Sequence, residues 1–238
     1  MPRFNPSVLR GSLLVPPLLL LSGCGGGDFE IASSLSRRPS SALASGKLTH
    51  RAIRVPTDEP FNLFLPTSSQ SGGGKADARV DPAGTAMCTA SCEGAGTAAA
   101  EFRIGYKFNM GSAPDADAIV KLELSSDRKM MREGEGLDTV ARYLLWAFVK
   151  DGHGAVLKKA TLSEGEGSTE GSLKLQTQFD LKLNSGVEYY LVIGGRATAN
   201  GTPNERSAAS VSVTAASVEI ATRPVAPATR PAAATSGT

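Results

Sequence analysis

Aromatic residues, histidine and cysteine are scarce in this chain of 238 residues: aromatics make up 5%, and there are two histidines and three cysteines. Only one long apolar run occurs, which excludes a protein that crosses a membrane many times. The 26 glycines show no period of three, which excludes a collagen-like chain. The length suits one domain with tails, or two small domains.

The N-terminal segment has the pattern of an export signal. Arg3 and Arg10 precede an apolar stretch, 12–21, that is too short to span a bilayer, for which about 20 apolar residues are needed. The order Leu21-Ser22-Gly23-Cys24 then resembles the signal of bacterial lipoproteins. That resemblance implies that 1–23 is a signal peptide, removed before Cys24. It also implies a diacylglycerol on the sulfur and an acyl group, such as palmitate, on the new amino group.

The residue after Cys24 bears on the location. By the same resemblance, an Asp there would favour retention in the inner membrane, and this chain has Gly25. We therefore expect a lipid anchor in the outer membrane of a Gram-negative cell, with the bilayer as partner through acylated Cys24. The alternative is an ordinary signal peptide with a chance cysteine near its end.

Removal of the leader also changes the charge balance. The leader carries two of the 25 Lys and Arg residues and no acidic residue, so the mature chain has 23 positive and 23 negative side chains. A neutral chain lacks the basic footprint of a nucleic-acid-binding protein. No nucleic-acid partner is therefore expected.

The first part of the mature chain is poor in large apolar residues. Residues 24–100 are rich in Gly, Ser, Ala and Pro, which predicts a lipidated N-terminus followed by a flexible tether. Two islands interrupt the tether. Residues 48–55 could form a weak strand, and 60–66 is interpreted as an edge strand or a segment docked on the following domain.

Alternating apolar and polar residues begin at Glu101 and indicate half-buried strands. The runs predict an all-β domain over 101–221, a single antiparallel β-sandwich of about seven strands joined by Gly-rich turns. Residues 222–238 are rich in Pro and Ala and predict a disordered tail. The expected strands lie at 102–108, 119–124, 140–150, 155–162, 173–183, 187–193 and 211–220.

Cys88 and Cys92 remain after lipidation of Cys24. Export places them in an oxidising compartment, where two thiols close in sequence usually pair, so a structural disulfide is predicted. A metal site is the weaker alternative, because neither histidine lies nearby in the sequence. A redox-active pair would normally be separated by two residues, and here three intervene.

Catalytic signals are weak. His50 lies in the expected tether, and His153 lies in the hairpin turn 151–154. No Gly-x-Ser-x-Gly motif presents a serine nucleophile. We therefore expect a protein that is not an enzyme and needs no cofactor, with a hydrolase as the remote alternative.

Two loops repeat Glu-Gly-Glu-Gly, and their carboxylates could surround a hard cation such as Ca²⁺. Acidic turns that keep sheet edges soluble are the commoner explanation, so no metal site is predicted. The weak calcium candidates are Glu133, Glu135, Asp138, Glu164, Glu166 and Glu170.

Taken together, these features favour a membrane-anchored envelope protein with a binding or structural role. Such a role implies another envelope protein as its partner. The alternative is a surface module for carbohydrate or calcium-dependent adhesion. Strand parity directs Tyr189 inward and Tyr190 outward, and Trp146 shares a face with Phe148. One outward Tyr is limited support for a sugar platform, and core packing is the default for the other aromatics.

Overall fold

The computed structural model describes residues 46–47, 52–134, 136 and 138–224. All of its regular elements are strands, and the described part has no helix long and apolar enough to cross a membrane. The strands are β1 (Gly46–Lys47), β2 (Ile53–Val55), β3 (Leu63–Val80), β4 (Ala86–Asn109), β5 (Ala116–Glu133), β6 (Val140–Asp151), β7 (Val156–Glu166), β8 (Thr169–Leu183), β9 (Glu188–Gly201) and β10 (Arg206–Pro224).

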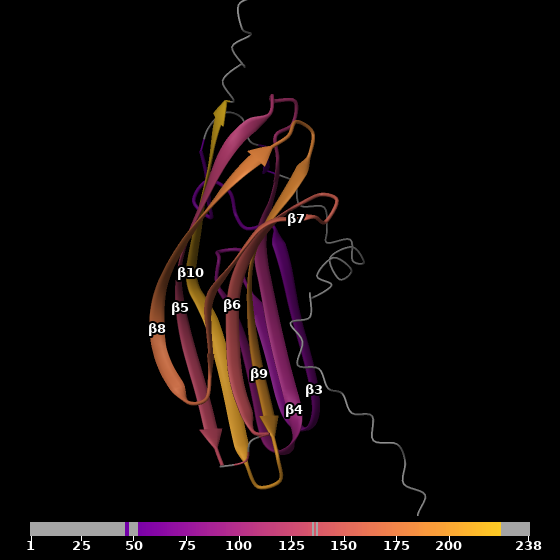
Figure 1. The fold of residues 1–238 in the computed structure, drawn as a ribbon, viewed down its shortest axis with the longest axis vertical. Coiled ribbons are helices and arrows are strands. Elements are labelled where there is room, and N and C mark those ends of the chain that lie inside the picture. Colours follow the sequence, from indigo (N-terminus) through magenta and orange to yellow (C-terminus); the bar gives the residue numbers. More distant parts are fainter. Residues whose placement is uncertain (1–45, 48–51, 135, 137, 225–238) are drawn as a thin grey trace, which may run out of the picture. The chain divides into compact units, whose positions relative to one another are not determined.

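Seven strands form a continuous hydrogen-bonded path in the order β7-β6-β9-β4-β10-β5-β8 (Figure 1). Outside this path, β2 pairs with β10, and β3 pairs with β4. The short β1 also pairs with β4, and this pair is parallel, whereas all the other pairs are antiparallel. The end strands β7 and β8 follow each other in the chain, so the sheet is nearly closed. The all-β prediction is confirmed, with ten strands in the described residues instead of about seven.

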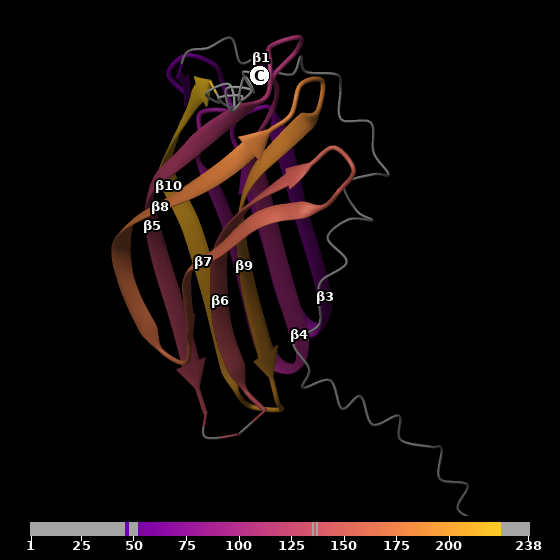
Figure 2. The same ribbon diagram turned by 45° about the horizontal axis from the view of Figure 1, so that its top comes forward.

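β4 belongs to both layers of the sandwich. Its first half, 86–93, pairs with β10, and its second half, 96–109, pairs with β9. β3 runs along the other edge of both halves (Figure 2). We call β7, β6, β9 and the second half of β4 the front sheet. The back sheet consists of β8, β5, β10 and the first half of β4.

Glycines allow β3 and β4 to approach closely where β4 changes partner. A Cβ on Gly73 would lie 1.9 Å from the carbonyl oxygen of Glu93, and one on Gly74 would lie 2.0 Å from that of Thr97. The pairing register shifts between Gly72 and Gly74. No side chain fits at this corner, so glycine is required there for space and not for chain flexibility.

The predicted tether over 24–100 is therefore wrong from Ile53 onward, because β2, β3 and the first part of β4 belong to the sheet. Composition misled the prediction, since Val80 and Met87 are the only large apolar residues over 66–100. The inward residues of β4 up to Ala100 are small and buried, and they share one core with the large residues of later strands. They include Cys88, Ala90, Cys92, Ala98 and Ala100. Residues 24–45 and 48–51 lie outside the described part.

The seven strands predicted from alternation are all present, and most are longer than predicted. The 151–154 turn forms the expected hairpin, with the backbone N–H of Asp151 donating to the carbonyl oxygen of Ala155 at 3.0 Å. β10 continues through Pro224, so the tail predicted from 222 begins too early. Residues 225–238 lie outside the described part. The edge strand expected at 60–66 corresponds to the start of β3, beside buried Phe61.

The core lies between the inner faces of the two sheets. Alternate residues of β4 and β6 face it, including Tyr106, Phe108, Tyr143 and Leu145. Two adjacent glycines of β9 each leave space for an aromatic ring of a neighbouring strand. A Cβ on Gly195 would lie 2.4 Å from the Phe102 ring, and a Cβ on Gly194 would lie 2.4 Å from the Trp146 ring. Phe102 belongs to the core cluster, whereas Trp146 does not.

Candidate functional site

Cys88 and Cys92 are free thiols, so the predicted disulfide is wrong. Both lie on β4 in an extended strand, where four residues span about 13 Å, well beyond the roughly 5–6 Å between the Cα atoms of a disulfide. Both side chains face the core. Burial raises the pKa of the Cys88 thiol to about 12, which makes it an inert packing residue. Cys24 lies outside the described residues.

The weak calcium candidates do not come together. Among the described residues, no three His, Cys, Asp or Glu side chains could hold a metal ion. Glu166 pairs with Arg142 at 3.1 Å, and Glu170 pairs with Lys129 at 3.3 Å. Each of these carboxylates therefore faces a cation of the neighbouring strand.

The remaining candidates are dispersed over turns and strands. Glu133 ends β5, Asp138 is an exposed residue before β6, and Glu164 is exposed in β7. Glu135 and His50 lie outside the described part. His153 is exposed in the β6–β7 turn, where its backbone N–H donates to the Asp151 carboxylate at 2.9 Å.

The loop that begins at Glu133 surrounds a carboxylate instead of a cation. Glu205 accepts hydrogen bonds from the backbone N–H of Gly136 at 2.8 Å and from the hydroxyls of Thr139 and Thr202. The Thr202 hydroxyl, the Gly136 N–H and nearby Arg132 lower the pKa of the Glu205 carboxyl. These contacts fasten the β5–β6 loop to the turn before β10, which is a structural role.

A more unusual group of side chains lies on the side of the front sheet that faces away from the core. We call this surface the front outer face. Trp146, Phe148 and Val192 are buried there, yet they lie outside the core cluster. The indole Nε1–H of Trp146 is fully shielded, and it has no hydrogen-bond acceptor within the part of the chain that the structure describes. Buried donors without acceptors are rare in folded proteins.

The front outer face also contains a nearly buried cluster of charges. The Glu101 carboxylate lies between two guanidinium groups, 2.5 Å from Nη2 of Arg103 and 3.1 Å from Nε of Arg196. The Glu101 and Arg103 side chains are only about a tenth exposed. Charges this far removed from water are costly unless they are paired, and removal of one partner leaves the other without compensation.

One row of this face crosses three strands. Lys150 of β6, Tyr190 of β9 and Lys107 of β4 are aligned by the pairing register. The two ammonium groups lie 5.1 Å and 5.7 Å from the centre of the Tyr190 ring, within the range of cation–π attraction. Tyr190 is half-buried and points outward, as its parity predicted, while Tyr189 is buried on the core side.

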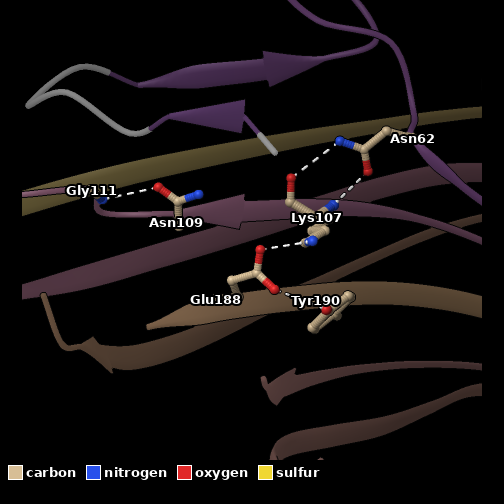
Figure 3. A network of polar contacts seen from close by, with 6 residues as sticks. All are labelled: Asn62, Lys107, Asn109, Gly111, Glu188 and Tyr190. Carbon is tan, nitrogen blue, oxygen red and sulfur yellow. Dashed lines mark hydrogen bonds and ion pairs between the residues drawn. The ribbon is translucent and has the colours of Figure 1, made fainter. Parts of the chain in front are cut away.

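Figure 3 shows how this row is held at one end. Lys107 pairs with Glu188 at 2.7 Å, and the Tyr190 hydroxyl donates to the same carboxylate at 3.2 Å. The hydrogen bond to Glu188 raises the pKa of Lys107. The Asn62 side chain bonds to both backbone groups of Lys107, at 2.6 and 3.1 Å, and so continues the pairing of β3 with β4.

Lys150 differs from Lys107 in its surroundings. Its exposed fraction is 7%, and burial followed by repulsion from Arg103 lowers the pKa of its ammonium group. Sequence reasoning missed Lys150 because it directly follows the run 143–149, in which every residue is apolar. It also missed Glu101, Arg103 and Lys107, although the parity that directs Phe102 inward directs Arg103 and Lys107 outward.

A groove of about 610 Å³ lies where β7 approaches the back sheet. It is bordered by Leu157 and Lys158 of β7, by 180–182 of β8 and by 117–119 of β5. β7 and β8 each pair with only one strand among the described residues. The groove thus lies beside two strands that each have a free edge.

No family model and no curated protein matches this chain. Among solved structures, the enzymatically active domain of tailspike protein 4 of bacteriophage CBA120 matches 67% of this chain and 19% of that chain, at 11% identity and a TM-score of 0.27. The matched region therefore spans about a fifth of the tailspike chain.

Two further solved structures match with similar scores. The CBM22-1 xylan-binding domain of Xyn10C from Paenibacillus barcinonensis matches 77% of this chain. The arabinose-bound MgGH51 α-L-arabinofuranosidase matches 76% of this chain. Their identities are 12% and 14%, their TM-scores 0.20 and 0.21, and the covered shares of those chains 100% and 27%. Scores this low establish neither a shared fold nor a shared ligand.

Proposed function

We propose that this chain is a non-catalytic binding protein of the bacterial envelope and that its front outer face binds a polysaccharide. The observation that carries the proposal is the concentration of aromatic and charged side chains on that face, outside the core. Lys150, Glu101 and Trp146 are all less than a tenth exposed although they point away from the core. Polar groups converging over an apolar floor are typical of ligand sites.

The strand arrangement supports side-chain recognition at this face. β4, β9 and β6 each have neighbours on both edges, so their backbone hydrogen-bonding groups are already used. A ligand must therefore be held by side chains above the sheet. Polysaccharides offer hydroxyls for such side chains, whereas extended peptides commonly bind by adding a strand to a free edge.

The test is calorimetric titration of the detergent-solubilised full chain with a panel of neutral and acidic polysaccharides. Binding of at least one polysaccharide is expected, with weaker binding by Tyr190→Ala, which removes the ring between the two lysines. Lys174→Ala, at an exposed position of β8, is the matched control and should bind normally. A panel without any binding contradicts the proposal.

The membrane anchor remains part of the proposal. It rests on the resemblance of Leu21-Ser22-Gly23-Cys24 to the lipoprotein signal and on Gly25 after it. Intact-mass analysis of protein extracted from outer membranes should give a chain that begins at Cys24 and carries added acyl mass. A soluble chain cut elsewhere would contradict the anchor.

A second candidate function is protein binding at the groove beside β7 and β8. Val156 and Leu157 of β7 are exposed, at 51% and 38%, next to that groove. An extended segment of an envelope protein could pair with the free edge of β7 and cover them. Crosslinking from a photoreactive residue at position 156 should then capture an envelope protein, and the same residue at position 174 should not.

A further inference from the structure

The front outer face carries a surplus of positive charge. Across the described parts of β4, β9 and β6, the central part of this face has four cationic and two carboxylate side chains. The cations are Arg103, Lys107, Lys150 and Arg196, and the carboxylates are Glu101 and Glu188. Removal of the predicted leader would leave the chain neutral, and the local excess would then be a property of this face.

The ion pairs leave one cation without a carboxylate. Glu101 pairs with Arg103 and Arg196, and Glu188 pairs with Lys107. Within the described chain, Lys150 makes no ion pair or hydrogen bond through its ammonium group, which lies 5.1 Å from the centre of the Tyr190 ring.

The charged groups around Lys150 come from each neighbouring strand. Arg103 of β4 repels it, and Lys107 lies on the far side of the Tyr190 ring of β9. Asp151, the next residue of β6, attracts it. The Asp151 carboxylate already accepts two backbone N–H groups of the β6–β7 turn, each at 2.9 Å.

A buried ammonium group without a counter-ion is unfavourable, and an anion from outside the chain would compensate it. The Lys150 side chain keeps 7% of its surface exposed, so it is shielded but not fully closed off from solvent.

We propose that the ligand of the front outer face is an acidic polysaccharide, one with uronic-acid carboxylates, and that Lys150 binds one of these carboxylates. The inference rests on the proposed function and adds the chemical class of the sugar. A carboxylate on Lys150 would lie beside the Tyr190 ring, whereas Arg103 and Lys107 already have carboxylate partners in the chain. An acidic peptide offers the same charge, but the paired edges of β4, β9 and β6 leave it no strand to join.

The experiment compares two polymers that share a backbone and differ in charge. The detergent-solubilised full chain is titrated with polygalacturonate, with its methyl ester and with poly-glutamate. Polygalacturonate should bind at least about tenfold more tightly than the ester, the factor expected for one charge-assisted hydrogen bond. Raising the salt concentration should reduce this difference.

Variants assign the effect to Lys150. Lys150→Gln should bind both polymers with the affinity of the wild type for the ester, and Lys150→Arg should retain the preference. Lys182→Gln, at an exposed position of β8, is the control and should bind like the wild type. The polymer comparison requires no variant, so it stands even if Lys150→Gln fails to fold.

The outcomes separate the two proposals. Equal binding of polygalacturonate and its ester overturns the acidic ligand and leaves polysaccharide binding intact. Failure of every polysaccharide to bind overturns both. Binding of poly-glutamate as tight as that of polygalacturonate overturns the acidic polysaccharide and identifies an acidic peptide instead. A preference for polygalacturonate that persists in Lys150→Gln overturns the assignment to Lys150.

Discussion

The two outward faces of this sandwich are built from the same kind of strands but differ in chemistry. On the back sheet, a shallow depression of about 320 Å³ is lined mostly by polar residues, such as Lys129, Ser210 and Ser212, together with the exposed Met87. On the front sheet, Trp146, Phe148 and Glu101 are buried without belonging to the core. A face that needs only to be soluble needs no buried charge, so the front outer face is where we place function.

The largest predicted difference concerns two ion pairs, one on each face. Glu101→Gln should reduce the free energy of unfolding by about 3 kcal/mol, because the nearly buried Arg103 loses its counter-ion. Glu170→Gln removes the exposed pair with Lys129 on the back sheet and should change stability by less than about 1 kcal/mol. Urea denaturation measures both, and equal losses would show that the two faces do not differ in this respect.

A second comparison uses glycine. Gly194→Ala should cost about 2 kcal/mol, because its Cβ would lie 2.4 Å from the Trp146 ring on a crowded face. Gly152→Ala is the control, since there the nearest atom would be 3.5 Å away, at ordinary contact distance. Thermal unfolding of both variants is the measurement. An unchanged melting temperature for Gly194→Ala would mean that the indole does not lie over this glycine.

A third prediction concerns pH. The pKa of Lys150 is lower in the folded protein than in the unfolded chain, where it is near 10.5. Between these two pKa values, the unfolded chain therefore binds more protons at this site than the folded protein does. Lys150 therefore destabilises the fold below its folded pKa, and this penalty disappears as the pH rises through the folded pKa toward 10.5. Lys150→Met removes the penalty at all pH values.

The variant should be more stable than the wild type at pH 7, and the gap should narrow as the pH rises. Denaturation of both proteins from pH 7 to 10 checks this. Lys129→Met, at an exposed position of the back sheet, should show no such trend. A gap that is constant with pH would contradict the burial of the charged group.

The smallest effect is expected at the back sheet. The Ser210 hydroxyl donates to the carbonyl oxygen of Lys129 across a long 3.4 Å, so Ser210→Ala should change stability by less than about 0.5 kcal/mol. Polysaccharide affinity should also stay unchanged. A clear loss of affinity in this variant would move the ligand to the back sheet.

The fold class could be predicted because the later strands alternate large apolar residues with polar ones. Phe102 to Phe108 shows this pattern directly, whereas Tyr143 to Val149 is apolar throughout, and both runs lie in strands that have neighbours on both edges. The segment from Ile53 to Ala100 could not be recognised in the same way. Its inward residues are mainly Ala and Cys, and its glycines serve close contacts at the corner, so its local composition resembles that of a linker.

The candidate site depended on information that one strand alone does not contain. Parity directs Arg103, Lys107 and Tyr190 outward, but only the pairing register aligns Lys107 and Tyr190 with Lys150 in one row. The disulfide prediction failed for a related reason. It assumed a turn at Cys88 and Cys92, and an extended strand separates the two thiols.

The most direct test of the central claim is a map of backbone amide shifts by NMR during titration with polygalacturonate. We predict that the largest changes occur at Arg103, Lys107, Lys150 and Tyr190 on the front outer face, with little change at Ser210. Changes confined to the back sheet or to the groove beside β7, or no change at any amide, would contradict the claim.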